Sequence, residues 1–374
     1  MAREPAVRCN ALVLARAAAD AKRHVSFWIM ATASTHKPSG SVTINPRLAA
    51  TSGCEPWTLR RESALAALRG QHVLFVGDSV TRHQYITLAY FLETGNWTSG
   101  QPNNADTRQW ASWHNFLTGT TTRIGGSASG GREVCDCGKR DDGSTSFENR
   151  YYLSPDATVR LSFIGWFEGS RGRLCGHGAL DAGELACLER AFRRASNGGG
   201  GGNALDGAIC PQRGCTVGDG CAGDEHDVWR GPFAQVLPAR VAALGASVVV
   251  LNQGLWGFPA DDADVDALVG LLRNLTSSRS PPLRVIWRTT TAPIDIPAYI
   301  PHRDFTERLA RLIDIETFDA GVLTAGLAGP HGDAITYGAF VDAKHLREPV
   351  YAWLNTALLG QLARPPITAA AATP

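Results

Sequence analysis

Residues 73–84, with the sequence VLFVGDSVTRHQ, decide the fold and the candidate chemistry of this chain. A short apolar run ends in Gly77-Asp78-Ser79, and the residues that follow have helical spacing. This pattern predicts a buried parallel strand, a tight turn and a helix that starts at the serine. The Ser79 hydroxyl and backbone N–H would then face the carboxyl edge of the sheet, where open α/β folds bind ligands. A serine nucleophile needs this arrangement, although an Asp-Ser pair also commonly does no more than cap a helix.

On both sides of this stretch, strand-like and helix-like segments alternate. We expect helices at about 57–70, from 79 to 95, and at 228–244, 261–275, 305–313 and 347–362. We expect strands at 72–76, 150–154, 158–167, 247–252 and 283–288. Strands that alternate with helices of these lengths predict an α/β fold, with a central parallel sheet and helices on both faces.

The domain organisation is expected to be simple. Residues 46–365 are predicted to form a single domain, preceded by a poorly ordered leader at 1–45 and followed by a disordered tail at 366–374. Two loop insertions, around 96–150 and 170–226, are rich in glycine and polar residues or contain cysteines. The run from Gly198 to Gly202 is typical of a flexible linker.

Composition and charge restrict the function classes. The chain of 374 residues is 44% hydrophobic and 19% charged, which is typical of a globular protein with a sizeable core. Its net charge of +1 provides no basic field, so we expect no nucleic-acid partner. An apolar run of about 18 residues, the length of a transmembrane helix, is not visible, nor is a membrane anchor or a well-formed signal peptide.

The nine cysteines bear on the cellular compartment. Seven of them fall in the loop-rich middle of the chain: Cys135, Cys137, Cys175, Cys187, Cys210, Cys215 and Cys221. Free thiols, zinc ligands and disulfides are the alternatives. The single residue between Cys135 and Cys137, without C-x₂-C pairs, argues against zinc, so we expect no metal site. Disulfides in an oxidising compartment are favoured, and the odd count leaves at least one cysteine over. Sequons at Asn96 and Asn274 fit N-glycosylation, but two is near the number expected by chance.

A candidate base follows near the end of the chain. In Asp342-Ala343-Lys344-His345 the imidazole comes three positions after the acid, so Asp342 could accept from one ring nitrogen while the other faces a nucleophile. The alternative is a helix-start aspartate beside a surface histidine.

A candidate oxyanion donor ends another buried strand. Asn252 follows the run at 248–251, so its side chain is expected at the same edge of the sheet as Ser79. Its amide could donate to a developing oxyanion, or it could simply hold the turn that follows.

A serine, an asparagine and an Asp-x-x-His in this chain order resemble the SGNH (GDSL-like) esterase superfamily. Residues 77–84 look like the G-D-S-x-x-R-x-Q motif of the trichome birefringence-like, or PC-esterase, family. Residues 252–256 resemble its N-x-G-x-W stretch, and Arg288-Thr289 resembles a basic-Thr pair after a later strand. The resemblance runs from about Cys54 to Leu362, and it is weak across the insertions.

This resemblance implies an SGNH-like three-layer sandwich with long loop insertions and a Ser-His-Asp triad. Carried over residue by residue, it makes Ser79 the nucleophile, His345 the base and Asp342 its orienting acid. The oxyanion would be bound by the Ser79 N–H and Asn252, with Gly165 as a further candidate. A group with a substrate-positioning or structural role comprises Arg82, Gln84, Gly254, Trp256 and Arg288.

The resemblance further implies O-acetyl transfer, through an acyl-serine, onto a polysaccharide or glycan hydroxyl. An acetyl donor would be the co-substrate, with no bound cofactor, and the Golgi lumen would be the usual location. The alternatives are an esterase or deacetylase of the same fold and an inert polysaccharide-binding protein. The ten tryptophans are compatible with stacking on sugar rings, although such residues are more often core aromatics.

Overall fold

The computed structural model describes the parts of the chain that surround one central sheet. These are residues 59–95, 97, 133–139, 145–154, 156–166, 173–177, 228–253, 262–277, 283–291, 305, 308–309, 311–313, 315–325, 345–346 and 348–363. The predicted leader at 1–45 and tail at 366–374 lie outside them, as do most of the two predicted insertions.

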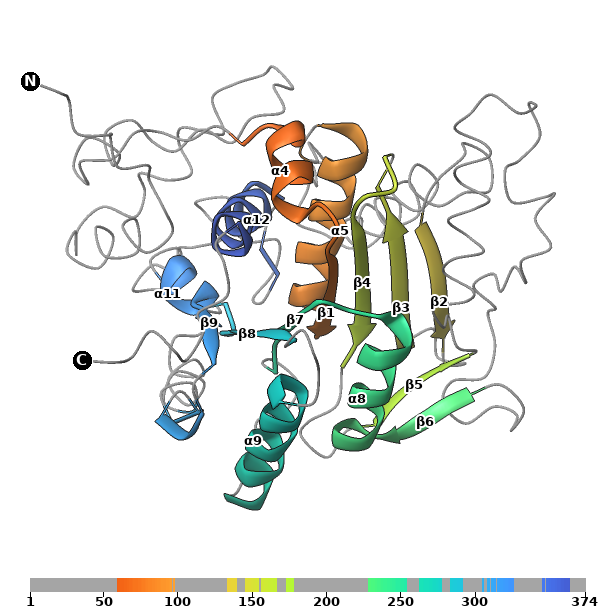
Figure 1. Ribbon diagram of the computed structural model, residues 1–374, viewed down its shortest axis with the longest axis vertical. Coiled ribbons are helices and arrows are strands. Elements are labelled where there is room, and N and C mark those ends of the chain that lie inside the picture. Colours follow the sequence, from red (N-terminus) through yellow and green to blue (C-terminus); the bar gives the residue numbers. More distant parts are fainter. Residues whose placement is uncertain are drawn as a thin grey trace, which may run out of the picture.

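The central sheet has seven strands in the order β2-β3-β4-β1-β7-β8-β9 (Figure 1). The strands are β1 (His72–Gly77), β2 (Glu133–Lys139), β3 (Thr145–Leu153), β4 (Arg160–Gly165), β7 (Val248–Leu251), β8 (Arg284–Arg288) and β9 (Glu316–Phe318). The pairs from β4 through β1, β7 and β8 to β9 are parallel, whereas β2–β3 and β3–β4 are antiparallel. A separate antiparallel pair joins β5 (Arg173–His177) to β6 (Val228–Pro232).

In the parallel part of the sheet, the order in which strands are added reverses at β1. Numbered along the chain, its five strands lie in the order 2-1-3-4-5, a common order in doubly wound α/β folds. The chain leaves β1 for β4 on one side and later returns to β7 on the other side. The edge of the sheet at the carboxyl ends of β1 and β7 is therefore the topological switch point, where such folds bind ligands.

Helices cover both faces of the sheet, so the expected α/β architecture is confirmed. The helices are α4 (Arg61–Leu68), α5 (Ser79–Thr94), α8 (Phe233–Leu244), α9 (Asp262–Ser277), α11 (Ala320–Ala325) and α12 (Glu348–Leu362). On one face Val73 and Phe75 pack with the buried residues of α4, α5 and α12. On the other face Leu74 and Val76 pack with α8 and α9. The alternation within β1 follows from the two-residue period of a strand.

Several predicted segments are wrong in detail. The segment 228–244 was expected to be one helix, but residues 228–232 form β6 and only Phe233–Leu244 is helical. The polar insertion around 96–150 contains β2 and most of β3, which extend the central sheet. Strand β9 and helix α11 follow β8 and were not anticipated. In each case pairing or packing with a distant part of the chain decides the local structure.

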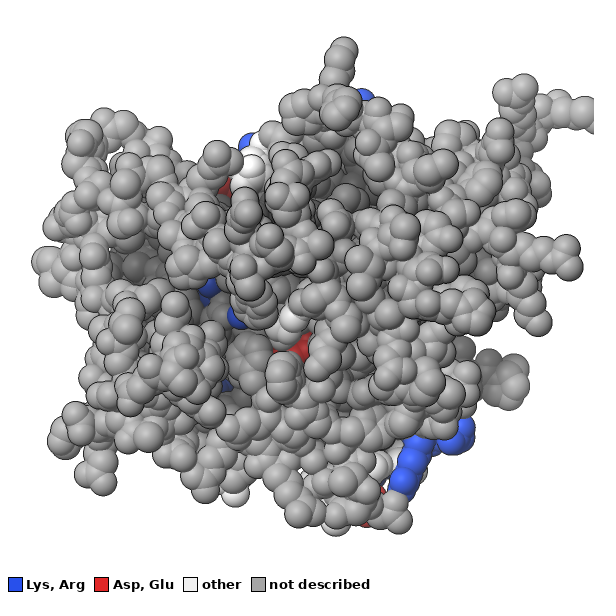
Figure 2. All heavy atoms as spheres, turned by 180° about the vertical axis from the view of Figure 1, so that it is seen from behind, with Lys and Arg blue, Asp and Glu red and all other residues white. Residues whose placement is uncertain are grey.

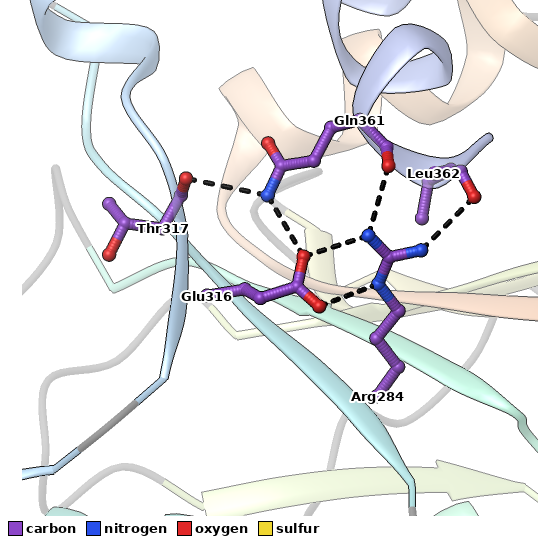
Figure 3. A network of polar contacts seen from close by, with 5 residues as sticks. All are labelled: Arg284, Glu316, Thr317, Gln361 and Leu362. Atoms are coloured by element: carbon purple, nitrogen blue, oxygen red, sulfur yellow. Dashed lines mark hydrogen bonds and ion pairs between the residues drawn. The ribbon is translucent and has the colours of Figure 1, made fainter. Parts of the chain in front are cut away.

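A network of hydrogen bonds around Arg284, called the clasp below, joins α12 to the sheet. Arg284, at the start of β8, donates to both carboxylate oxygens of Glu316, at the start of β9, each at 2.8 Å. Figure 3 shows the same guanidinium donating to the carbonyl oxygens of Gln361 and Leu362 at the end of α12. It therefore satisfies carbonyl groups that the helix end leaves without an intrahelical partner. The clasp fixes the far end of the helix that begins just after His345.

The described residues also bear on surface charge and on membrane-spanning helices. Among the described residues visible in Figure 2, Lys and Arg atoms occur in separate small groups, with no broad field of one sign. None of the described helices is both long enough and apolar enough to cross a membrane. Asn274, in one of the two sequons, lies exposed on α9.

Candidate active site

The turn between β1 and α5 is built by Gly77 and Asp78. Asp78 has an extended backbone and caps α5: its Oδ1 accepts from the N–H of Val80 at 2.9 Å and of Thr81 at 3.2 Å. A Cβ at Gly77 would lie 2.5 Å from Thr81 Oγ1 and 3.1 Å from the Asn252 carbonyl oxygen. Glycine is therefore required for close approach of the strand end to the helix, and Asp78 shapes the turn.

Ser79 begins α5 and meets His345 across the site. Its Oγ lies 2.7 Å from His345 Nε2, within hydrogen-bond distance. Ser79 is 8% exposed, and His345 is partly buried. When Nε2 is the unprotonated ring nitrogen, the hydroxyl donates to it, and the imidazole is then placed to take the proton. The structure thus brings together two residues that were predicted to act together, 266 positions apart in the chain.

The backbone N–H of Ser79 is available at the same point. Asp78 takes the N–H groups of Val80 and Thr81 with its side chain, and its carbonyl oxygen accepts from the N–H of Arg82. Within the described part of the chain, the Ser79 N–H has no acceptor. A free N–H at a helix N-terminus is suited to an oxyanion, because the helix dipole adds partial positive charge there.

The imidazole of His345 contacts the ring of His83, which in turn contacts Tyr351. The ring of His83, one helical turn after Ser79, meets the His345 ring edge to face, with centroids 5.4 Å apart and planes at 88°. The ring of His83 also contacts that of Tyr351 of α12, with centroids 5.8 Å apart. His83 is 4% exposed, and its burial lowers its pKa well below the ordinary value; the charges of Arg82, His345 and Arg150 act in the same direction.

Asn252 lies at the expected edge, but its amide is occupied. Nδ2 donates to the Arg288 carbonyl oxygen at 2.9 Å and to Thr290 Oγ1 at 3.3 Å, while Oδ1 accepts from Thr81 Oγ1 at 3.2 Å. A carbonyl oxygen only accepts, so this orientation of the amide is chemically fixed. In this geometry Asn252 ties the ends of β7 and β8 to α5. To bind an oxyanion it would have to give up the longer bond, to Thr290.

Gln84 and Arg288 form a buried pair behind the site. Arg288 Nε donates to Gln84 Oε1 at 2.6 Å, and both side chains are 0% exposed. Burial lowers the pKa of Arg288, and the nearby charge of Asp78 partly opposes this. Asn355 of α12 donates to the Gln84 carbonyl oxygen at 3.0 Å, so α5, β8 and α12 are joined at one place. In the structure, Gln84 and Arg288 therefore connect a helix to a strand and to the neighbouring helix α12.

Of the remaining residues predicted for the site, the structure describes Gly165 and Arg82. Gly165 ends β4 directly beside Gly77, and the next N–H, that of Trp166, donates to the Gly77 carbonyl oxygen at 2.7 Å. Arg82 is partly buried on the first turns of α5. Three further predicted residues lie outside the described residues: Asp342, Gly254 and Trp256.

Sequence reasoning missed His83, Thr81 and Asn355. A signal existed for His83, because residues i and i+4 of a helix lie on the same face, and His83 is i+4 from Ser79. Thr81 carried no signal of its own, since its partner Asn252 belongs to a distant strand. Asn355 also lacked one, because it bonds to α5 from the last helix.

The described residues contain no group of three or more His, Cys, Asp or Glu side chains arranged to hold a metal. Of the tryptophans they include, Trp166 and Trp287 are buried, and Trp166 stacks on Phe233 with ring centroids 3.7 Å apart. These two are core aromatics. What the described geometry offers is a serine, an imidazole and a backbone donor, which together suit acyl transfer.

The chain was compared with protein-family models and with curated proteins. No family model matches it. No curated protein matches it either.

Proposed function

We propose that this chain is a serine-dependent O-acetyltransferase, which moves an acetyl group through an acyl-serine onto a hydroxyl of a polysaccharide or glycan. The observation that carries the proposal is the 2.7 Å contact between Ser79 Oγ and His345 Nε2 at the switch point of the sheet. The acceptor class rests on the resemblance of residues 77–84 to the PC-esterase motif. An acetyl donor would be the co-substrate.

The proposed reaction has two displacements. In the first, His345 Nε2 takes the Ser79 proton, and Oγ bonds to the acetyl carbon of the donor. The tetrahedral oxyanion is bound by the Ser79 N–H, and the leaving group departs with the proton from Nε2. In the second, Nε2 takes a proton from the sugar hydroxyl, whose oxygen bonds to the acetyl carbon. Ser79 Oγ then leaves and recovers that proton.

In this mechanism Asp342 would accept from Nδ1 of His345, so that Nε2 is the basic nitrogen. We further propose that the fold is SGNH-like. Two features support this: the 2-1-3-4-5 order of the parallel strands, and a serine directly after the first of them. The cysteine content and the resemblance support a place in the secretory pathway, with the Golgi lumen as the proposed compartment.

The test is incubation of the full chain with acetyl donors and a panel of oligosaccharides, read by mass spectrometry. Acetylated oligosaccharide is expected from the wild type and is expected to disappear in Ser79→Ala and His345→Ala. Ser162→Ala is the matched control, because Ser162 Oγ also lies 2.7 Å from a histidine nitrogen, that of His72, but inside the sheet. It is expected to keep the activity, after its fold has been checked by circular dichroism.

Three other outcomes would each replace or exclude the proposed reaction. Release of acetate from acetylated xylan or pectin, without transfer to any acceptor, would replace the transferase by a deacetylase of the same mechanism. Equal product from the wild type and Ser79→Ala would exclude the serine mechanism. Binding of an oligosaccharide that survives Ser79→Ala, with no product from the wild type, would favour a binding protein.

A further inference from the structure

We propose that His83 is a positioning residue for His345: its neutral ring holds the imidazole of the base over Ser79. The inference rests on the proposed function, because it assigns His345 the role of base. His83 occupies a position that the G-D-S-x-x-R-x-Q pattern leaves open, so its role follows from this chain's own geometry.

Helix geometry places Ser79 and His83 beside the same partner. Residues i and i+4 of an α-helix lie on one face, one above the other. His345 uses both: Nε2 lies 2.7 Å from Ser79 Oγ, and its ring stands edge to face with that of His83, centroids 5.4 Å apart. Edge-to-face packing is a favourable arrangement of two aromatic rings, so α5 contributes both the nucleophile and a wall for the base.

His83 is itself held firmly. It is 4% exposed, and its ring contacts both His345 and Tyr351, whose centroids are 5.4 Å and 5.8 Å away. Tyr351 is fully buried on α12, the helix that is joined to α5 through Asn355. The wall formed by His83 therefore has little freedom to move. A displacement of the base by about 1 Å is enough to slow a catalysed step about 100-fold, so such a wall matters.

The neutral state of His83 is also part of the role. The charged and titratable groups that face it are Arg82 on its own helix, Arg150 on β3, and His345. With burial, all three lower the pKa of His83, and Tyr351 faces it from α12. When His345 takes the proton from Ser79 it becomes a cation. A neutral neighbour lets that cation form, whereas a second imidazolium at this distance would oppose it.

The test compares His83→Ala, which removes the wall, with His83→Phe, which keeps an aromatic ring and cannot titrate. A fluorophosphonate probe reacts covalently with a nucleophilic serine. The rate of Ser79 labelling, followed against probe concentration, gives the probe affinity and the maximal labelling rate separately. We expect His83→Ala to reduce the maximal rate about 10- to 100-fold with little change in affinity. We expect His83→Phe to restore the rate to within about 3-fold, with the pH dependence of the wild type. If the alanine variant does not fold, His83→Leu replaces it.

A labelling rate for His83→Ala equal to that of the wild type overturns the inference. Equal loss in the alanine and phenylalanine variants also overturns it, because an aromatic ring at position 83 would then have no effect. The proposed function can fail separately, if the wild type is neither labelled nor active. In that case the ¹³C-labelled His345 ring is followed by NMR. An unchanged signal and titration in His83→Ala overturns the positioning role, and a displaced, broadened ring signal supports it.

Discussion

Replacing His72 by glutamine is expected to remove a large part of the pH dependence of the stability of this fold. His72 begins β1 and is 2% exposed. Its Nδ1–H donates to the Leu244 carbonyl oxygen at 2.9 Å, and its Nε2 accepts from Ser162 Oγ at 2.7 Å. Leu244 offers only an acceptor, so Nδ1 carries a proton, and the bond that Nε2 accepts from Ser162 then requires the neutral ring. Burial is the main reason that the pKa of His72 falls from 6.5 to about 4.

The size of the effect follows from these two pKa values. Between pH 6.5 and 4 the unfolded chain binds a proton that the folded chain does not, so the free energy of unfolding decreases as the pH falls. The contribution of His72 is complete above pH 6.5. At about 1.4 kcal/mol per pH unit, about 2 kcal/mol is lost by pH 5 and about 3 kcal/mol by pH 4. At pH 7 His72→Gln is expected to cost about 1–2 kcal/mol, from weakened hydrogen bonds.

The assay is urea unfolding of wild type and His72→Gln at pH 7.5, 6, 5 and 4, followed by tryptophan fluorescence. Carboxylates and His83 titrate in both proteins and cancel in the difference between them. The difference in the free energy of unfolding should therefore shrink, or change sign, by about 2 kcal/mol between pH 7.5 and 5. A difference that stays constant within about 0.5 kcal/mol would refute the reasoning, as would an NMR titration that places the His72 pKa near 6.5.

Three further changes test the packing around the site and the clasp. Gly77→Ala inserts a methyl group where α5 meets the strand end, and it is expected to cost about 1–3 kcal/mol in urea unfolding and to slow labelling of the serine. Glu316→Ala leaves the guanidinium of Arg284 buried without its carboxylate, and about 3 kcal/mol of stability should be lost in thermal and urea unfolding. Gln84→Glu replaces the Nε2 donor, which has no acceptor among the described residues, and gives the buried cation of Arg288 a carboxylate. It is expected to raise the free energy of unfolding at pH 7 by about 1 kcal/mol.

Each of these predictions has its own control. Gly70→Ala tests the conformational cost of a glycine at φ +74° with open space around it, so it separates backbone strain from the collision at Gly77. Glu62→Ala removes an exposed carboxylate from α4 and should change stability by less than about 0.5 kcal/mol. Gln84→Leu should destabilise, since it removes the acceptor of Arg288 Nε. Stability that is unchanged in Gly77→Ala or Glu316→Ala, or lower in Gln84→Glu, contradicts the corresponding argument.

The strand–turn–helix at residues 72–94 could be predicted because its signals are local. An apolar run, a glycine, a capping Asp78 and a helical face specify these elements without reference to the rest of the chain. The position of His345 opposite Ser79 came from motif order and not from local physics. The contact between the two residues depends on the packing of α12 on α5, and no local sequence pattern encodes that packing.

Other features depend on distant partners and escaped prediction for that reason. Residues 228–232 are a strand because they pair with β5, although the helix that follows made a longer helix the natural expectation. The strand β2 contains few of the residues that favour strands, and it forms as the edge of a sheet. The sequence located Asn252 at the correct edge, but the direction of its amide depends on the carbonyl oxygen of Arg288, on the neighbouring strand.

The separation of Ser79 from its imidazole, 266 residues along the chain, has a consequence for the life of the protein. The hydroxyl is made early in synthesis, and its partner precedes the last described helix. The nascent chain therefore carries Ser79 long before His345, the base of the proposed mechanism, and the two meet as α12 packs on α5. Contacts between such distant segments form slowly in folding. On the proposed mechanism, reactivity of Ser79 towards a phosphonate should report completion of the fold, and its rise in a refolding experiment should time the docking of α12.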